Sequence, residues 1–202
     1  MLEFLATVAL GVVLGLSLAA PPGPVNALIA SHAVTRSWRS GFFVGVGALT
    51  ADTCFLVISV LAHSLIEGVR VVFPFIALLG ASVMVYFAWR ATQAWKQVPA
   101  VSAPSFEAHV GSYVTGLTVN ITSPYALLWW LTAGLALIDQ LGAVVLVGFF
   151  AGIILWTMAF PYALRAAQQR YARTYRIVLA FSIFCLGAFA AWLAWNALSA
   201  LL

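Results

Sequence analysis

The chain has 202 residues, of which 64% are hydrophobic and only 7% are charged, with a formal net charge of +4. A soluble domain carries about 25% charged residues, so nine Lys and Arg and five Asp and Glu are too few to coat a water-soluble globule. The composition excludes a soluble enzyme and predicts an all-α integral membrane protein, because backbone inside a bilayer must satisfy its own hydrogen bonds. The bases lie between apolar runs and form no basic stripe, so no nucleic-acid partner is expected.

Six apolar runs reach the length of about 20 residues that a helix needs to cross a bilayer. They cover residues 4–33, 41–62, 69–91, 111–137, 141–164 and 176–200. The polar segment 92–110 links two halves, 1–91 and 111–202, of a single transmembrane domain, 1–202. The first run begins after Glu3 with no preceding Lys or Arg, so we expect it to remain as a span and not to be cleaved as a signal peptide.

The motif Pro21-Pro22-Gly23-Pro24 interrupts the first run. Proline has no backbone N–H, and its ring clashes with the preceding helical turn, so this motif breaks a helix. A straight helix of about 30 residues would also be about 45 Å long, which exceeds a hydrocarbon core of about 30 Å. The first span is therefore predicted to consist of two half-helices, the second of which starts near Pro24.

Asp52 lies midway along the second run. A carboxylate at this depth costs about 2.5–3.5 kcal/mol, and such residues usually mark a transport pathway. One interpretation is that Asp52 carries or gates a coupling proton. The other is that a protonated Asp52 bonds to Thr50 or Thr53 and holds helices together.

A second interruption, from Asn120 to Pro124, falls in the fourth run. Ser123 or Thr122 can cap the next half-helix, because their hydroxyls accept from backbone N–H groups. Pro124 suits the first turn of that half-helix. The fourth span is therefore predicted to be broken like the first.

The two interruptions together predict a substrate-binding site. Each break leaves carbonyls on one side and N–H groups on the other without helical partners, and these groups cannot face lipid. The N–H end carries partial positive charge and suits a carboxylate. The alternative is a pair of structural kinks packed by neighbouring helices. The candidate substrate-binding residues are Pro22, Gly23, Pro24, Asn26, Asn120, Ser123 and Pro124.

The two halves of the chain resemble each other. The segment 23–30 aligns with 123–130, and 79–91 aligns with 186–197 with one residue of slippage. Spans one to three would then recur as spans four to six, and an odd number of spans per repeat inverts the second copy. This predicts a 3+3 inverted repeat in which helices one and four are broken. The alternative is a chance alignment of helices rich in Ala, Leu and Gly.

The basic residues predict the orientation in the membrane. Eight of the nine Lys and Arg lie in the connections on one side of the predicted spans, and basic loops face the cytoplasm. Both termini are therefore expected outside the cytoplasm, in a multi-pass protein of the cytoplasmic (inner) membrane. The eight residues are Arg36, Arg39, Arg90, Lys96, Arg165, Arg170, Arg173 and Arg176.

Other side chains carry weaker signals. Packing within the bundle explains the deep tryptophans more simply than a cavity lining does; they are Trp129, Trp130 and Trp156. The histidines lie near connections and are expected to be solvated; they are His32, His63 and His109. Cys54 and Cys185 lie inside apolar runs and predict neither a disulfide framework nor a metal site.

Several of these motifs occur together in one known family. They are Pro22-Gly23-Pro24, Asn26, Gly41 through Gly47, Asp52, Leu79 through Arg90, Gly116, Asn120, Ser123-Pro124 and Trp129-Trp130. Together they resemble the LysE/RhtB translocator family of bacterial and archaeal amino-acid exporters, over nearly the whole chain. The chain departs from the family pattern where Val25 follows the Pro-Gly-Pro motif, Ala51 precedes the acid and Ser123 precedes the proline.

The resemblance implies export of a small amino acid or a related metabolite in exchange for protons. No nucleotide-binding motif is present, so ATP-driven transport is not expected, and neither is a cofactor. A metal-ion or other small-solute exporter is an alternative, although a metal-ion exporter would need several acids within the membrane. A membrane scaffold that transports nothing is another. The expected partners are a small-molecule substrate and the lipid bilayer, and the interfacial Trp and Gly residues are compatible with a homodimer.

Overall fold

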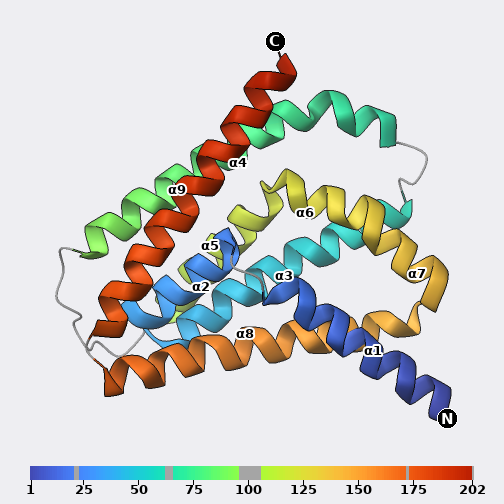
Figure 1. Ribbon diagram of the computed structural model, residues 1–202, viewed down its shortest axis with the longest axis horizontal. Helices are drawn as coiled ribbons and strands as arrows, with labels where there is room; N and C mark the ends of the chain where they lie inside the picture. The colour runs from blue at the N-terminus through green and yellow to red at the C-terminus, as the bar shows by residue number, and fades with distance from the viewer. Residues whose placement is uncertain (21–22, 62–65, 96–105, 172, 202) are drawn as a thin grey trace.

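A computed structural model describes residues 1–20, 23–61, 66–95, 106–171 and 173–201. These residues form helices and no strand (Figure 1), which confirms the all-α prediction. The elements in chain order are α1 (Leu2–Ala19), α2 (Pro24–Thr35), α3 (Trp38–Leu61), α4 (Ile66–Trp95), α5 (Phe106–Ile121), α6 (Pro124–Trp129), the π-helix η2 (Trp130–Gly134), α7 (Leu135–Leu141), α8 (Val144–Arg170) and α9 (Arg173–Leu201).

The outer surface of the molecule is apolar. Large hydrophobic side chains project outward, including Phe184 and Trp195, which are 74% and 72% exposed. In water such a surface would be strongly unfavourable, whereas lipid solvates it. Among the described residues, four helices are long and apolar enough to cross a bilayer, namely α1, α3, α8 and α9. The chain is therefore a multi-pass membrane protein.

Both predicted interruptions are present in the fold. The first run divides into α1 and α2, and α2 begins at Pro24. The fourth run divides into α5 and α6, and α6 begins at Pro124. By contrast, Pro74 and Pro161 lie inside the continuous helices α4 and α8, so these two prolines do not interrupt their helices.

Two features differ from the sequence-based expectation. The chain after the second break passes through a π-helix before α7, whereas a plain half-helix was expected. The linker predicted at 92–110 is shorter, because α4 continues to Trp95 and α5 already begins at Phe106. Residues 96–105 of that linker lie outside the described residues.

Glycines allow the closest helix pairs to form. A Cβ at Gly11 or Gly15 of α1 would collide with the α8 backbone, and one at Gly148 of α8 would collide with Val8 of α1. In the same way, Gly47 of α3 lies against the α5 backbone, and Gly116 of α5 lies against Val44 of α3. Because a Cβ would separate these backbones, the small residues hold α1 against α8 and α3 against α5.

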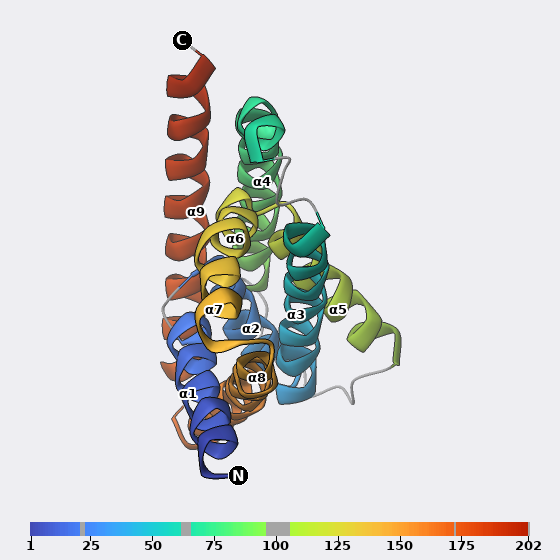
Figure 2. The same cartoon turned by 90° about the vertical axis from the view of Figure 1, so that its right-hand side faces the viewer.

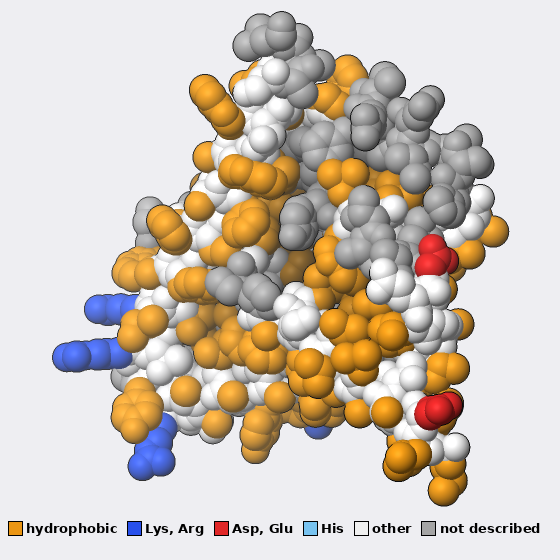
Figure 3. Space-filling view, turned by 45° about the vertical axis from the view of Figure 1, so that its right-hand side comes forward, with side chains coloured by type: hydrophobic (Ala, Val, Ile, Leu, Met, Phe, Trp, Pro, Cys, Tyr) orange, Lys and Arg blue, Asp and Glu red, His pale blue; other side chains and the backbone are white. Residues whose placement is uncertain are grey.

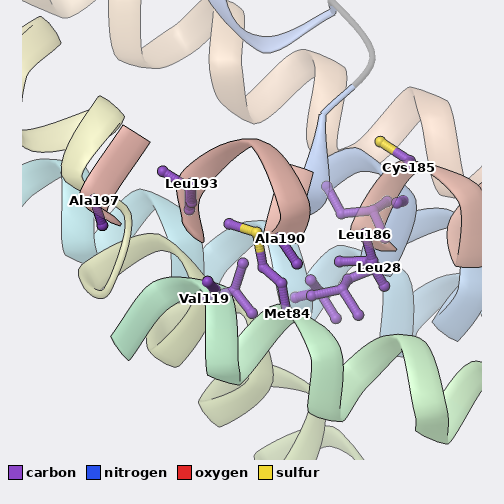
Figure 4. Close-up of a cluster of buried hydrophobic side chains, with 12 residues drawn as sticks. Leu28, Met84, Val119, Cys185, Leu186, Ala190, Leu193 and Ala197 are labelled. Carbon is purple, nitrogen blue, oxygen red and sulfur yellow. The ribbon is translucent and has the colours of Figure 1, made fainter. Parts of the chain in front are cut away.

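The half-helix α2 lies inside the bundle, between α3, α8 and α9. Every residue from 26 to 34 is buried. Leu28 of α2 meets Met84 of α4 and Leu186 of α9 in one apolar cluster (Figure 4). The α4 and α9 helices run side by side in both ribbon views (Figures 1 and 2). This packing places the helical residues that follow the first break in the interior of the protein.

On one face of the molecule (Figure 3), the charged side chains gather at opposite ends. Figure 3 shows Lys and Arg side chains at one end and Asp and Glu side chains at the other, with an apolar surface between them. Such a band of apolar surface between charged ends is typical of a protein embedded in a bilayer.

Candidate functional site

A cavity of about 840 Å³ lies where the two chain breaks face the middle of the bundle. Its lining draws on α1, α2, α3, α5, α8 and α9 and on the segment from α6 to α7. The predicted site residues in the lining are Gly23, Pro24, Asn26, Asp52, Asn120 and Ser123. Pro124 forms the first turn of α6, directly after Ser123, and Pro22 lies outside the described residues. The fold thus brings six predicted site residues from distant parts of the sequence into the lining of one cavity.

Asn26 bridges the first break. Its Nδ2 donates to the Ala19 carbonyl at the end of α1, at 2.6 Å. Its Oδ1 accepts from the Trp156 Nε1 of α8, at 3.1 Å. Gly23 adopts an extended conformation as the N-cap of α2 and supplies no side-chain cap. The break therefore depends on bonds that reach across it.

Ser123 closes the second break locally. Its backbone is extended, and its Oγ accepts from the Ala126 N–H at 3.4 Å, as an N-cap does. Its own N–H donates to the Asn120 carbonyl at 3.0 Å. The Asn120 Nδ2 donates to the Ala48 carbonyl of α3 at 2.8 Å, so the end of α5 is tied to α3 beside Asp52.

Asp52 takes its partner from the segment after the second break. The Trp130 Nε1 donates to its Oδ1 at 3.2 Å, and Asn120 lines the same cavity. Thr50 and Thr53 donate to carbonyls of their own helix, which does not support the alternative in which Asp52 bonds to either threonine. Trp130 begins the π-helix η2, and such turns often occur at functional sites.

Aromatic side chains form much of the cavity wall. The deep tryptophans were expected to pack in the bundle, and each also lines the cavity. Trp129 stacks on Phe149 at 5.5 Å between ring centroids, and Trp156 stacks on Phe160 at 5.0 Å. The sequence could have indicated that Trp129 and Trp130 line the cavity, because they come only a few residues after the predicted break.

Asp52 is the one ionisable side chain among the described residues that line the cavity. In the described part of the chain, no group of three or more His, Cys, Asp and Glu residues comes together as a metal site would require. The electrostatics of the cavity are therefore those of one carboxylate surrounded by indoles, amides and apolar side chains.

Polar contacts secure the opposite end of α2. Arg165 Nη1 and Gln168 Nε2 of α8 donate to the Val34 carbonyl at 3.2 Å and 2.9 Å. His32 Nδ1 and the Ser112 Oγ of α5 are 3.0 Å apart. The prediction that His32 is solvated is wrong, because the packing of α2 inside the bundle buries it. These bonds fix the C-terminal end of α2 within the bundle.

Comparison with known proteins identifies the family. A protein of Bacillus subtilis (strain 168) described as "Putative amino acid efflux protein YcgF" is 27% identical over 169 residues, which cover 79% of each chain. No solved structure matches the chain. The LysE type translocator family matches residues 16–197, which include both breaks, Asp52 and the whole cavity wall apart from Leu14. The chain therefore belongs to the LysE type translocator family.

Proposed function

We propose that this protein is a secondary transporter that exports a small amino acid or related metabolite across the cytoplasmic membrane in exchange for protons. The observation that carries the proposal is the cavity at the two breaks, with a single carboxylate in its wall. Membership of a translocator family and the likeness to a protein named for amino acid efflux support it.

The proposed site holds the two charged ends of an amino acid separately. Asp52 attracts the ammonium group. The side-chain amides of Asn26 and Asn120 form the polar part of the cavity wall. The first turn of α2, at Gly23 and Pro24, brings the positive end of a helix dipole to the same cavity. That partial charge suits the substrate carboxylate. Ser123 and Pro124 define the corresponding edge at α6.

Asp52 is also the proposed proton carrier. Its carboxylate can hold either a proton or a substrate ammonium group, and holding both at once would leave an unbalanced positive charge in a poorly solvated cavity. Arrival of one therefore displaces the other. Such competition at a single group couples substrate and proton fluxes in opposite directions.

We further propose that the chain crosses the membrane six times as a 3+3 inverted repeat. The helix packing supports this proposal, because exchange of the halves maps the α1–α8 pair onto the α5–α3 pair and α4–α9 onto itself. Glycines make the close backbone contacts in both the α1–α8 pair and the α5–α3 pair. In such transporters, one repeat moves against the other around a central site and exposes it to each side in turn.

The basic end of the bundle is proposed to face the cytoplasm. Both termini then lie on the other side. A C-terminal alkaline phosphatase fusion is expected to be active in a bacterial host. Fluorescence of a C-terminal fluorescent protein in the cytoplasm would reverse the proposed orientation of the termini.

Counterflow in proteoliposomes tests the transport function. Vesicles loaded with a mixture of unlabelled amino acids should transiently accumulate labelled amino acid from outside, whereas protein-free vesicles should not. A scaffold protein would give no counterflow with any solute. Accumulation of labelled divalent cations without amino-acid counterflow would instead favour the metal-ion alternative.

A further inference from the structure

We infer that the cavity selects an amino acid zwitterion with a bulky apolar or aromatic side chain. This inference rests on the proposed transport function and adds the substrate class. It is carried by three features of the lining: its charge, the hydrogen bonds of its polar groups and its aromatic wall.

The charge of the lining excludes a second anionic group on the substrate. Asp52 is the sole ionisable side chain of the described lining, and no Lys, Arg or His joins it. A substrate with an acidic side chain would bring a second carboxylate into a cavity that holds no cationic side chain. A buried charge without a partner is strongly unfavourable. One acid does, however, match the single ammonium group of a neutral amino acid.

The polar side chains of the lining already have partners within the protein. Ser17 Oγ donates to the Leu14 carbonyl, and Thr157 Oγ1 donates to the Ile154 carbonyl. Asn26 and Asn120 donate to the Ala19 and Ala48 carbonyls.

A polar substrate side chain would therefore lose its water without gaining equivalent bonds. Asn26 and Asn120 tie neighbouring segments together, whereas Ser17 and Thr157 bond within their own helices. The cost of leaving a buried polar group unpaired disfavours hydroxyl- or amide-bearing side chains.

Aromatic rings supply the remaining wall. Trp129, Trp130 and Trp156 line the cavity, and so do Phe189 and Trp192 of α9. The rings of Trp129, Trp130 and Trp156 stack on Phe149, Phe150 and Phe160, respectively. Rings supported in this way make a rigid apolar surface, which binds a large apolar side chain by burial and by offset stacking.

The α9 helix offers a matched pair of tryptophans for a test. Trp192 lines the cavity and is 50% exposed, whereas Trp195 does not line it and is 72% exposed. Neither belongs to the buried core, so Trp192→Ala and Trp195→Ala remove the same ring with little effect on the core. Only the first is expected to change selectivity.

The experiment is counterflow of single labelled amino acids in proteoliposomes that contain the purified full chain. We expect leucine and phenylalanine to be taken up with at least about tenfold greater efficiency than glycine or serine, since small differences in apolar contact give ratios of that order. Glutamate and lysine should give little uptake. Trp192→Ala should reduce the preference for phenylalanine over alanine about tenfold, and Trp195→Ala should leave it unchanged.

Two kinds of result would overturn the inference. Lysine or arginine transported as well as phenylalanine would show that the aromatic wall serves a cationic side chain by cation–π contact; serine or glutamate transported equally well would show that the wall does not select. In either case the proposed transport function stands. If folded, monodisperse protein transports no amino acid at all, the proposed function fails together with the substrate class.

Discussion

The two chain breaks lie on the same cavity but are stabilised in different ways. The first break has no side-chain cap at Gly23 and is spanned by Asn26, which bonds to α1 on one side and to Trp156 of α8 on the other. The second break has the local cap Ser123. The first break thus depends on tertiary contacts, whereas local sequence closes the second.

The segments that come after the two breaks differ as well. The half-helix α2 is enclosed by the bundle, with residues 26–34 buried. The segment after Ser123 passes through a π-helix that presents Trp130 to Asp52. We conclude that the first break anchors the fold around the cavity, while the segment after the second supplies the indole that contacts the carboxylate. This comparison can be tested by substitutions at Asp52, Asn26 and Ser123, and at two glycines of the closest helix contacts, Gly15 and Gly116.

The largest effect is expected from Asp52→Asn. Asparagine is nearly isosteric and can still accept from the Trp130 indole, so the variant should fold and insert. It should lose efflux driven by an imposed pH gradient, because the amide neither binds nor releases the coupling proton. Exchange of substrate for substrate can persist, since it moves no net proton.

Gradient-driven efflux and exchange should be measured side by side in proteoliposomes. Asp139→Asn is the matched control, because Asp139 lies exposed at the end of α7 and outside the cavity. Full gradient-driven efflux by Asp52→Asn would return Asp52 to a purely structural role. It would also remove the functional distinction drawn for the second break.

The next largest effect is expected when alanine replaces a glycine at which two helix backbones touch, Gly15 or Gly116. Gly15→Ala loosens the α1–α8 contact that supports the first break, and Gly116→Ala loosens the α5–α3 contact that supports the second. Each inserted Cβ meets backbone, which cannot move aside cheaply, so each variant should lose about 3 kcal/mol of stability, the upper end of overpacking costs.

Thermal unfolding of the purified variants in detergent provides the measurement. Gly187→Ala is the control, because a Cβ at Gly187 meets nothing within 4 Å, and alanine slightly favours the helix. If Gly116→Ala were as stable as Gly187→Ala, the close α3–α5 packing would be contradicted.

A smaller loss is expected from Asn26→Ala. This substitution leaves the Trp156 N–H and the Ala19 carbonyl without their bonds to Asn26, which costs about 1–3 kcal/mol for buried polar groups. The half-saturation concentration for substrate should rise as well, because both partners border the cavity. Asn196→Ala serves as the control, since Asn196 is exposed and bonds only within its own helix.

The smallest loss is expected from Ser123→Ala. The cap bond is long, at 3.4 Å, so its removal should cost at most about 1 kcal/mol. Ser199→Ala, at an exposed serine of α9, is the control in the same unfolding assay. A loss larger than that of Asn26→Ala would reverse the comparison between the breaks.

The sequence by itself determined the helical class, the positions of both breaks and the lone acid at mid-depth. These are local or compositional properties. Proline suits the first turn of a helix, where its missing N–H costs no bond, and α2 and α6 begin at Pro24 and Pro124 as predicted. The shortage of charged residues likewise requires a lipid environment in any arrangement of the helices.

Only the tertiary structure decided which groups meet. Asp52 contacts Trp130, which is 78 residues away in sequence, although two threonines are its near neighbours. His32 is buried beside Ser112 because α2 lies in the centre of the bundle. Such partnerships depend on how helices cross, and crossing depends on glycines and side-chain shapes from several elements at once. Local sequence patterns do not show which distant helix surfaces will meet. The cavity and the hydrogen-bond partners of Asp52 and His32 can therefore be identified only once the helices are packed.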